Sequence, residues 1–172
     1  MKTTRILFLA GVLSFLLMGC PYESTVPVDD PSNCKPNKGL VGRWEQKGKD
    51  DFEWDVTLEG NIYKFEQKYL DGSDPYEKEV YFGTISDVAG TSFLSLWSSK
   101  QEEGQPRKYM IFKIENKGDE RVVLYEMTDN IKQKFESSAE LKAFIKKNKD
   151  VEWFYNINDG YNREIRKFYK NE

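Results

Sequence analysis

Apolar and polar residues alternate along much of the chain after residue 39, with the period of two that is typical of β-strands facing a core. The plainest example is Phe52–Leu58. Clusters of Gly, Asn, Asp and Pro separate the alternating runs and predict turns. We therefore expect strands over residues 40–45, 52–58, 62–70, 76–86, 91–98, 108–114 and 121–127, and a last strand over 162–169.

A single segment breaks this period and predicts a helix. Ser137 and Glu140 have the spacing of a capping box, in which both side chains satisfy free N–H groups at a helix start. Leu141, Phe144 and Ile145 then form one apolar stripe. Asn148 follows as a residue that can end the helix.

The fold class that follows is mainly β, an antiparallel meander closed as a barrel or folded as a sandwich. Segments 93–97, 110–114 and 122–125 are apolar on both faces. One face must pack inward, and we expect the helix to cover the other. Aromatic residues make up 15% of the chain, which supplies enough buried area for a core despite 32% charged residues.

The first 19 residues have the features of a signal peptide. Lys2 and Arg5 form a positive start, and residues 6–18 are almost wholly apolar. A helix over residues 6–19 would span about 21 Å, short of the hydrocarbon core of about 30 Å. The segment is therefore expected to be a signal-peptide core and not a permanent membrane span.

Leu17-Met18-Gly19-Cys20 resembles the bacterial lipobox, although Met18 replaces the usual small residue. The resemblance implies an acylated Cys20 that anchors the protein to a membrane. Pro21 after the cysteine implies sorting to the outer membrane of a Gram-negative envelope. Residues 20–27 are also similar to the start of certain uncharacterised bacterial lipoproteins.

Residues 20–39 are predicted to form a Pro-rich tether between the anchor and a domain over residues 40–172. Proline blocks helix and favours an extended, semi-rigid spacer. Tyr22, Val26 and Val28 could still pack on the domain. If Cys20 carries lipid, Cys34 has no partner for a disulfide and is expected to be an exposed free thiol.

Several function classes are disfavoured by composition. The absence of histidine excludes Ser-His-Asp and Cys-His catalysis and any His-ligated metal. Carboxylate pairs such as Glu53/Asp55 sit on polar strand faces or in turns, where solvated acids are expected. With a net charge of −3 and no Arg stripe, nucleic-acid binding is also disfavoured. We expect no enzyme activity, cofactor or metal.

Gly42-Arg43-Trp44, at the start of the first long strand, resembles the Gly-x-Trp motif of lipocalins. The resemblance implies a barrel of about eight strands whose closed end is plugged by Trp44. It also implies an Arg from the last strand stacked on that Trp, a role open to Arg163 or Arg166. Lipocalins normally place their helix after the last strand, whereas here it precedes it. The alternative is that Trp44 is an ordinary core tryptophan.

A closed barrel of this size can hold side chains or one small ligand. Seven aromatic residues could line such a cup: Tyr63, Phe65, Phe82, Phe93, Trp97, Tyr109 and Phe112. A solidly filled core is the alternative. We expect a non-enzymatic binding module at the envelope, with a small apolar molecule as the candidate ligand. The alternatives are an inhibitor or immunity-type protein, with Gln101–Pro106 as the contacting loop, and a structural accessory of an envelope complex.

Overall fold

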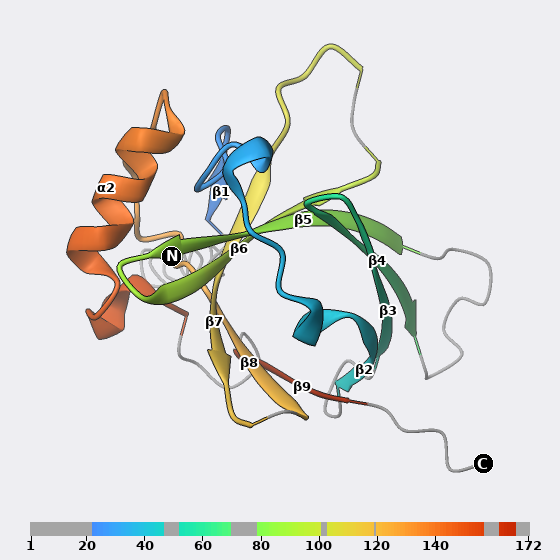
Figure 1. Cartoon of the computed structure of the whole chain (residues 1–172). Coiled ribbons are helices and arrows are strands. Elements are labelled where there is room, and N and C mark those ends of the chain that lie inside the picture. Colours follow the sequence, from blue (N-terminus) through green and yellow to red (C-terminus); the bar gives the residue numbers. More distant parts are fainter. Residues whose placement is uncertain are drawn as a thin grey trace, which may run out of the picture.

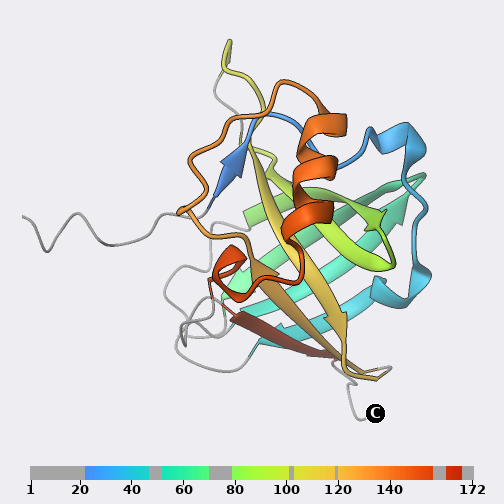
Figure 2. The ribbon, with the colours of Figure 1, turned by 90° about the vertical axis from the view of Figure 1, so that its left-hand side faces the viewer.

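The computed structural model describes residues 22–46, 52–69, 79–100, 103–118, 120–156 and 162–167. Within these ranges the chain forms an eight-stranded antiparallel barrel with an α-helix on its outside (Figures 1 and 2). The barrel strands are β2 (Gly42–Gln46), β3 (Phe52–Glu59), β4 (Ile62–Tyr69), β5 (Glu79–Val88), β6 (Thr91–Ser98), β7 (Tyr109–Asn116), β8 (Arg121–Glu126) and β9 (Asn162–Lys167). The other elements are β1 (Glu23–Ser24), the 3₁₀ turns η2 (Pro31–Asn33), η3 (Lys38–Leu40) and η4 (Glu152–Phe154), and the helix α2 (Ser138–Asn148).

Closure of the barrel depends on β9, which pairs with β2 on one side and with β8 on the other. Trp44 lies opposite Lys167 in the first pairing, and Val122 lies opposite Ile165 in the second. Every barrel strand therefore has neighbours on both sides, which removes the free edges of an open sheet. The predicted antiparallel meander is confirmed, and it closes as a barrel and not as a sandwich.

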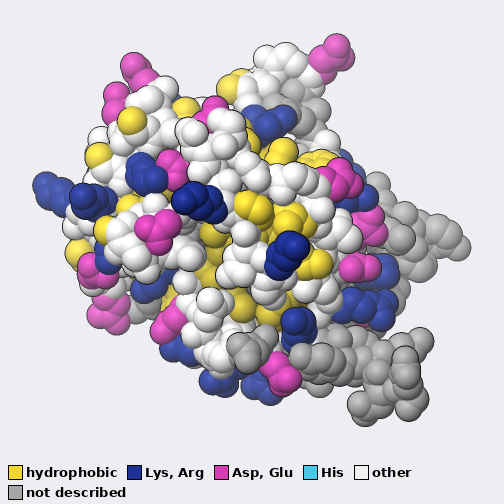
Figure 3. Space-filling model, in the orientation of Figure 1, with side chains coloured by type: hydrophobic (Ala, Val, Ile, Leu, Met, Phe, Trp, Pro, Cys, Tyr) yellow, Lys and Arg dark blue, Asp and Glu magenta, His cyan; other side chains and the backbone are white. Residues whose placement is uncertain are grey.

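The two ends of the barrel differ in their connections. Short turns after β3, β5 and β7 lie at one end, which we call the closed end, and η3 crosses it (Figure 1). The Trp44 Nε1–H donates to the Leu40 carbonyl over 2.8 Å and fixes η3 there. Figure 3, in the same orientation, shows hydrophobic side chains gathered in the centre of this face and charged ones around them. The connections from β6 to β7 and from β8 to β9 begin and end at the opposite end, the open end.

The barrel interior is packed with large side chains towards the closed end. Trp44, Trp54, Tyr63, Phe65 and Phe112 are each at most 1% exposed. An eight-stranded barrel is just wide enough for side chains to fill it.

Gly83 makes room for this packing on the inner face of β5. A Cβ atom at this position would lie 2.8 Å from Leu94 Cδ1 and 3.1 Å from Phe65 Cε2. Both contacts are closer than van der Waals packing permits. The packing of the interior therefore requires a residue without a side chain at position 83.

A second apolar layer lies outside the barrel. Phe93 and Ile111 point outward from β6 and β7 and pack with Leu141 and Ile145 of α2. Figure 2 shows α2 lying in front of these strands. Ser137 Oγ accepts from the Glu140 N–H and starts the helix as expected. The prediction that the helix covers the outer apolar face is confirmed.

Residues 22–37, here called the N-terminal strap, also belong to this outer layer. Val28 is fully buried, and its N–H donates to Ser95 Oγ over 3.0 Å. Lys142 of α2 forms an ion pair of 2.6 Å with Asp29. At the far end of the strap, Tyr63 Oη donates to the Asn37 carbonyl. The segment expected to be a spacer is therefore packed along the barrel wall, including the Tyr22 and Val28 side chains.

Cys34 differs from the expectation of an exposed thiol. Its side chain is 5% exposed, and its Sγ lies 3.7 Å from Ser86 Oγ on the outer face of β5. The thiol is free and buried. The expectation failed because η2 turns the chain back onto β5 just before this residue.

Replacing Gly83 with alanine tests the tight interior. We expect Gly83→Ala to lower the free energy of unfolding by about 1–3 kcal/mol, because the added methyl group overpacks Phe65 and Leu94. Denaturant unfolding measures the change. Thr57→Ala, at an exposed position of β3, is the control and should change the free energy by less than about 0.5 kcal/mol. Equal stability of Gly83→Ala and wild type would contradict the packing argument.

Candidate functional site

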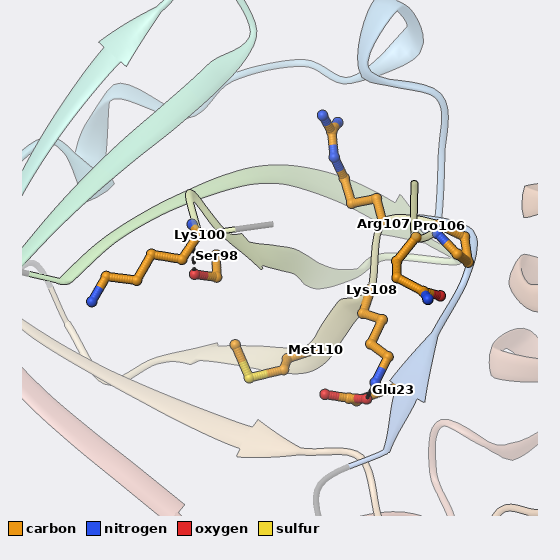
Figure 4. Close-up of a pocket in the computed structure, with 8 residues that line it drawn as sticks. Glu23, Ser98, Lys100, Pro106, Arg107, Lys108 and Met110 are labelled. Atoms are coloured by element: carbon orange, nitrogen blue, oxygen red, sulfur yellow. Dashed lines mark hydrogen bonds and ion pairs between the residues drawn. The ribbon is translucent and has the colours of Figure 1, made fainter. Parts of the chain in front are cut away.

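A hollow of about 450 Å³ opens at the open end of the barrel, in the size range of small-molecule sites. Ser98 and Met110 contribute the inner faces of β6 and β7, and Lys100 extends the β6 wall (Figure 4). Residues 105–108 of the connection between these strands complete the rim together with Glu23 of β1. We call this space the mouth hollow.

The charged side chains of the rim fall into two groups. Lys108 Nζ forms an ion pair of 2.8 Å with Glu23, which joins β1 to the start of β7. Arg107 points away from this pair in Figure 4, and its guanidinium lies 5.0 Å from the ring centre of Trp97 on the outer face. Lys100, Arg107 and Lys108 are the cations among the residues that line the hollow.

Polar side chains occupy inner positions of four strands near their open-end termini. This polar ring consists of Gln46, Gln67, Tyr81 and Glu126. Gln67 Oε1 accepts from Trp54 Nε1–H over 2.7 Å, and Tyr81 Oη donates to Glu79 over 2.7 Å.

Two members of the ring are buried acceptors of particular interest. Glu126 is 5% exposed, and Gln46 Oε1 is buried without a hydrogen-bond partner among the described residues. A buried polar atom without a partner costs free energy, so this one marks a place where a ligand or water can bind. Polar side chains thus lie beside apolar ones such as Phe52 in the open half of the barrel interior.

The seven aromatic residues expected to line one cup lie in two different layers. Tyr63, Phe65 and Phe112 belong to the barrel interior. Four others lie in the outer layer, namely Phe82, Phe93, Trp97 and Tyr109. Successive residues of a strand point to opposite faces of the sheet. The outer four occupy positions that point outward, whereas the other three occupy positions that point inward. The seven therefore do not line a common cavity, and the interior three are packed among other side chains.

The residues of the Gly-x-Trp motif lie in β2, and the cation over the Trp44 ring is not the expected one. Gly42 has φ +129°, a conformation that favours glycine, and Trp44 is 1% exposed near the closed end of the barrel. The cation over the Trp44 ring is Lys167, with Nζ 5.9 Å from the ring centre. Arg166 points outward and bonds Glu164, so its expected role is wrong. The Arg163 side chain lies outside the described part.

The polar ring was missed at the level of sequence, although a signal for it exists. Gln46 has the same phase as Trp44, Gln67 the same phase as Phe65, and Glu126 the same phase as Leu124. Polar residues in phase with a buried stripe indicate a polar patch inside a barrel.

In the described part of the chain, no three Cys, Asp or Glu side chains are grouped closely enough to hold a metal ion. Burial raises the pKa of the Tyr63 phenol, which stays protonated as a donor to Asn37.

Among the described helices, none has the length and apolar character that a membrane span requires. Cys20 and the expected signal peptide lie outside the described ranges.

Comparisons of this chain with protein-family models, with curated proteins and with solved structures find no match.

The bond between Trp54 and Gln67 is expected to stabilise the inner wall of the barrel at β3 and β4. Gln67→Leu should lower the free energy of unfolding by about 1–3 kcal/mol, because it leaves a buried indole N–H without an acceptor. The same substitution in a Trp54→Phe background should cost less, since that background lacks the donor. Denaturant unfolding of the four proteins gives the coupling energy. Purely additive effects would contradict the role of this hydrogen bond.

Proposed function

We infer that this chain is an envelope lipoprotein, anchored through an acylated Cys20, whose lipocalin-like barrel is a non-enzymatic binding module. Its ligand enters the mouth hollow at the open end. The observation that carries this proposal is the hollow itself, about 450 Å³ in volume and bordered by Lys100, Arg107 and Lys108. Barrel mouths are common positions for small-molecule sites.

The chemistry of the hollow favours an amphipathic ligand with an anionic or hydrogen-bonding group. Lys100, Arg107 and Lys108 supply positive charge at the rim, where Glu23 offsets one of the charges. Met110 offers an adaptable apolar contact. A wholly apolar ligand deep in the barrel is less favoured, because aromatic side chains fill the closed half.

A titration with a dansyl-labelled fatty acid tests the mouth hollow. The protein is prepared from residue 21 onward, without the anchor. Lys100→Ala should weaken binding tenfold or more, since a hydrogen bond to a charged group contributes about 1.5–3 kcal/mol. Ser98→Trp should block binding by filling the hollow.

Lys38→Ala, at the closed end, is the matched control and should bind the probe as wild type does. If all variants bind equally, the probe occupies another place and the mouth hollow is not the site. If no protein binds the probe, the protein-facing alternatives gain support.

The anchor is tested by exchanging each of the two cysteines in the full chain. Cys20→Ser should move the protein from the membrane fraction to the soluble fraction and remove the acyl mass from its mass spectrum. Cys34→Ser should change neither, because a buried thiol is not an acylation site. Membrane retention of Cys20→Ser would contradict the lipoprotein assignment.

A further inference from the structure

We propose that the open end of the barrel faces the membrane to which the protein is anchored, so that the mouth hollow opens toward the lipid head groups. The inference rests on the proposed acylation of Cys20. It adds an orientation and a contact surface that acylation alone does not supply.

Chain length limits the distance between the anchor and the barrel. Tyr22 is already packed, with a side chain that is 6% exposed. Two residues span at most about 7 Å, so the Cα atom of Cys20 lies within about 7 Å of the Tyr22 Cα atom. Pro21 alone separates the acylated residue from the packed chain. The lipid therefore enters the membrane directly beside the barrel surface.

The point of attachment is at the open end. Glu23 and Ser24 pair with Met110 and Tyr109, the first residues of β7. The Tyr22 N–H donates to the Met127 carbonyl, just past the end of β8. Glu23 also lines the mouth hollow. The residue two positions before Tyr22 is thus held next to the rim.

The attachment is tied to the barrel at several points and cannot swing away as a spacer would. Tyr22 Oη donates to the Gln133 carbonyl, and Thr25 Oγ1 donates to the Phe135 carbonyl. Val28 is fully buried further along the strap. These contacts join the strap to the connection between β8 and α2 as well as to the sheet.

The surface around Tyr22 suits a lipid head-group region. Lys132 and Lys134 are exposed on either side of Gln133, and basic side chains near a membrane surface favour anionic lipids. Trp153 is 54% exposed in η4, two residues before Tyr155, which bridges Met127. Tryptophan is enriched at membrane–water interfaces. Asp129 offsets part of this positive charge. The short distance between Cys20 and Tyr22 therefore supports the orientation more strongly than the surface charge does.

The opposite end of the molecule is then held away from the lipid. β7 runs from the open end to the closed end over the eight residues Tyr109–Asn116. At about 3.3 Å per residue and a tilt of about 40°, this places the closed end roughly 20 Å further from the bilayer. Lys38 of η3, over the closed end, should lie in water.

Two labelled positions test the orientation on the lipidated full chain. An environment-sensitive fluorophore is attached to Gln133→Cys or to Lys38→Cys, each in a Cys34→Ser background. The protein is reconstituted in phosphatidylcholine vesicles with nitroxide-labelled head groups. We expect the label at position 133 to lose most of its emission and the label at position 38 to lose little. Equal quenching at both positions would overturn the proposal.

A linker variant tests whether the short anchor is the cause. Twenty Gly and Ser residues inserted between Cys20 and Pro21 give a mean reach of about 25 Å and leave the strap untouched. The contrast between the two labels should then disappear, and a contrast that survives would overturn the inference. Only protein whose mass includes the acyl groups is used. A missing acyl mass therefore counts against the proposed function, whereas a missing contrast counts against the orientation.

Discussion

Closure of the sheet by β9 is the constraint on which the rest of this structure depends. Because β9 bonds to β2 and to β8, the interior volume is set by eight strands and cannot expand. Every large side chain that points inward must fit that volume. Phe65 and Leu94 do so only because β5 carries Gly83 where they meet.

The same closure creates the second apolar layer. Strands β6 and β7 are apolar on both faces, and a closed barrel can bury only one of them. Phe93, Ile111 and their outward neighbours need cover from elsewhere in the chain. The helix α2 supplies part of it and the N-terminal strap supplies the rest, which ties the start of the chain to its C-terminal half through Lys142 and Asp29.

The N-terminal strap links the proposed anchor to the proposed binding site. The strap begins at the rim of the mouth hollow, where Glu23 pairs with Lys108, and ends over the closed end, where Asn37 bonds Tyr63. A lipid attached two residues before the strap thus holds the open end near the bilayer. A ligand for the mouth hollow would then be met at the membrane surface and not in open solvent.

The sequence by itself determined the local elements. The strands, the helix capped by Ser137 and the position of the Gly-x-Trp motif follow from periodicity and turn chemistry, which act between neighbouring residues. The tertiary structure decided which face of each strand points inward, and therefore that Phe93 and Trp97 lie outside while Gln67 and Glu126 lie inside. It also decided that Lys167 and not Arg166 covers Trp44, and that Cys34 is buried. These outcomes depend on strand register and on contacts between segments far apart in the chain, and alternation alone cannot specify them.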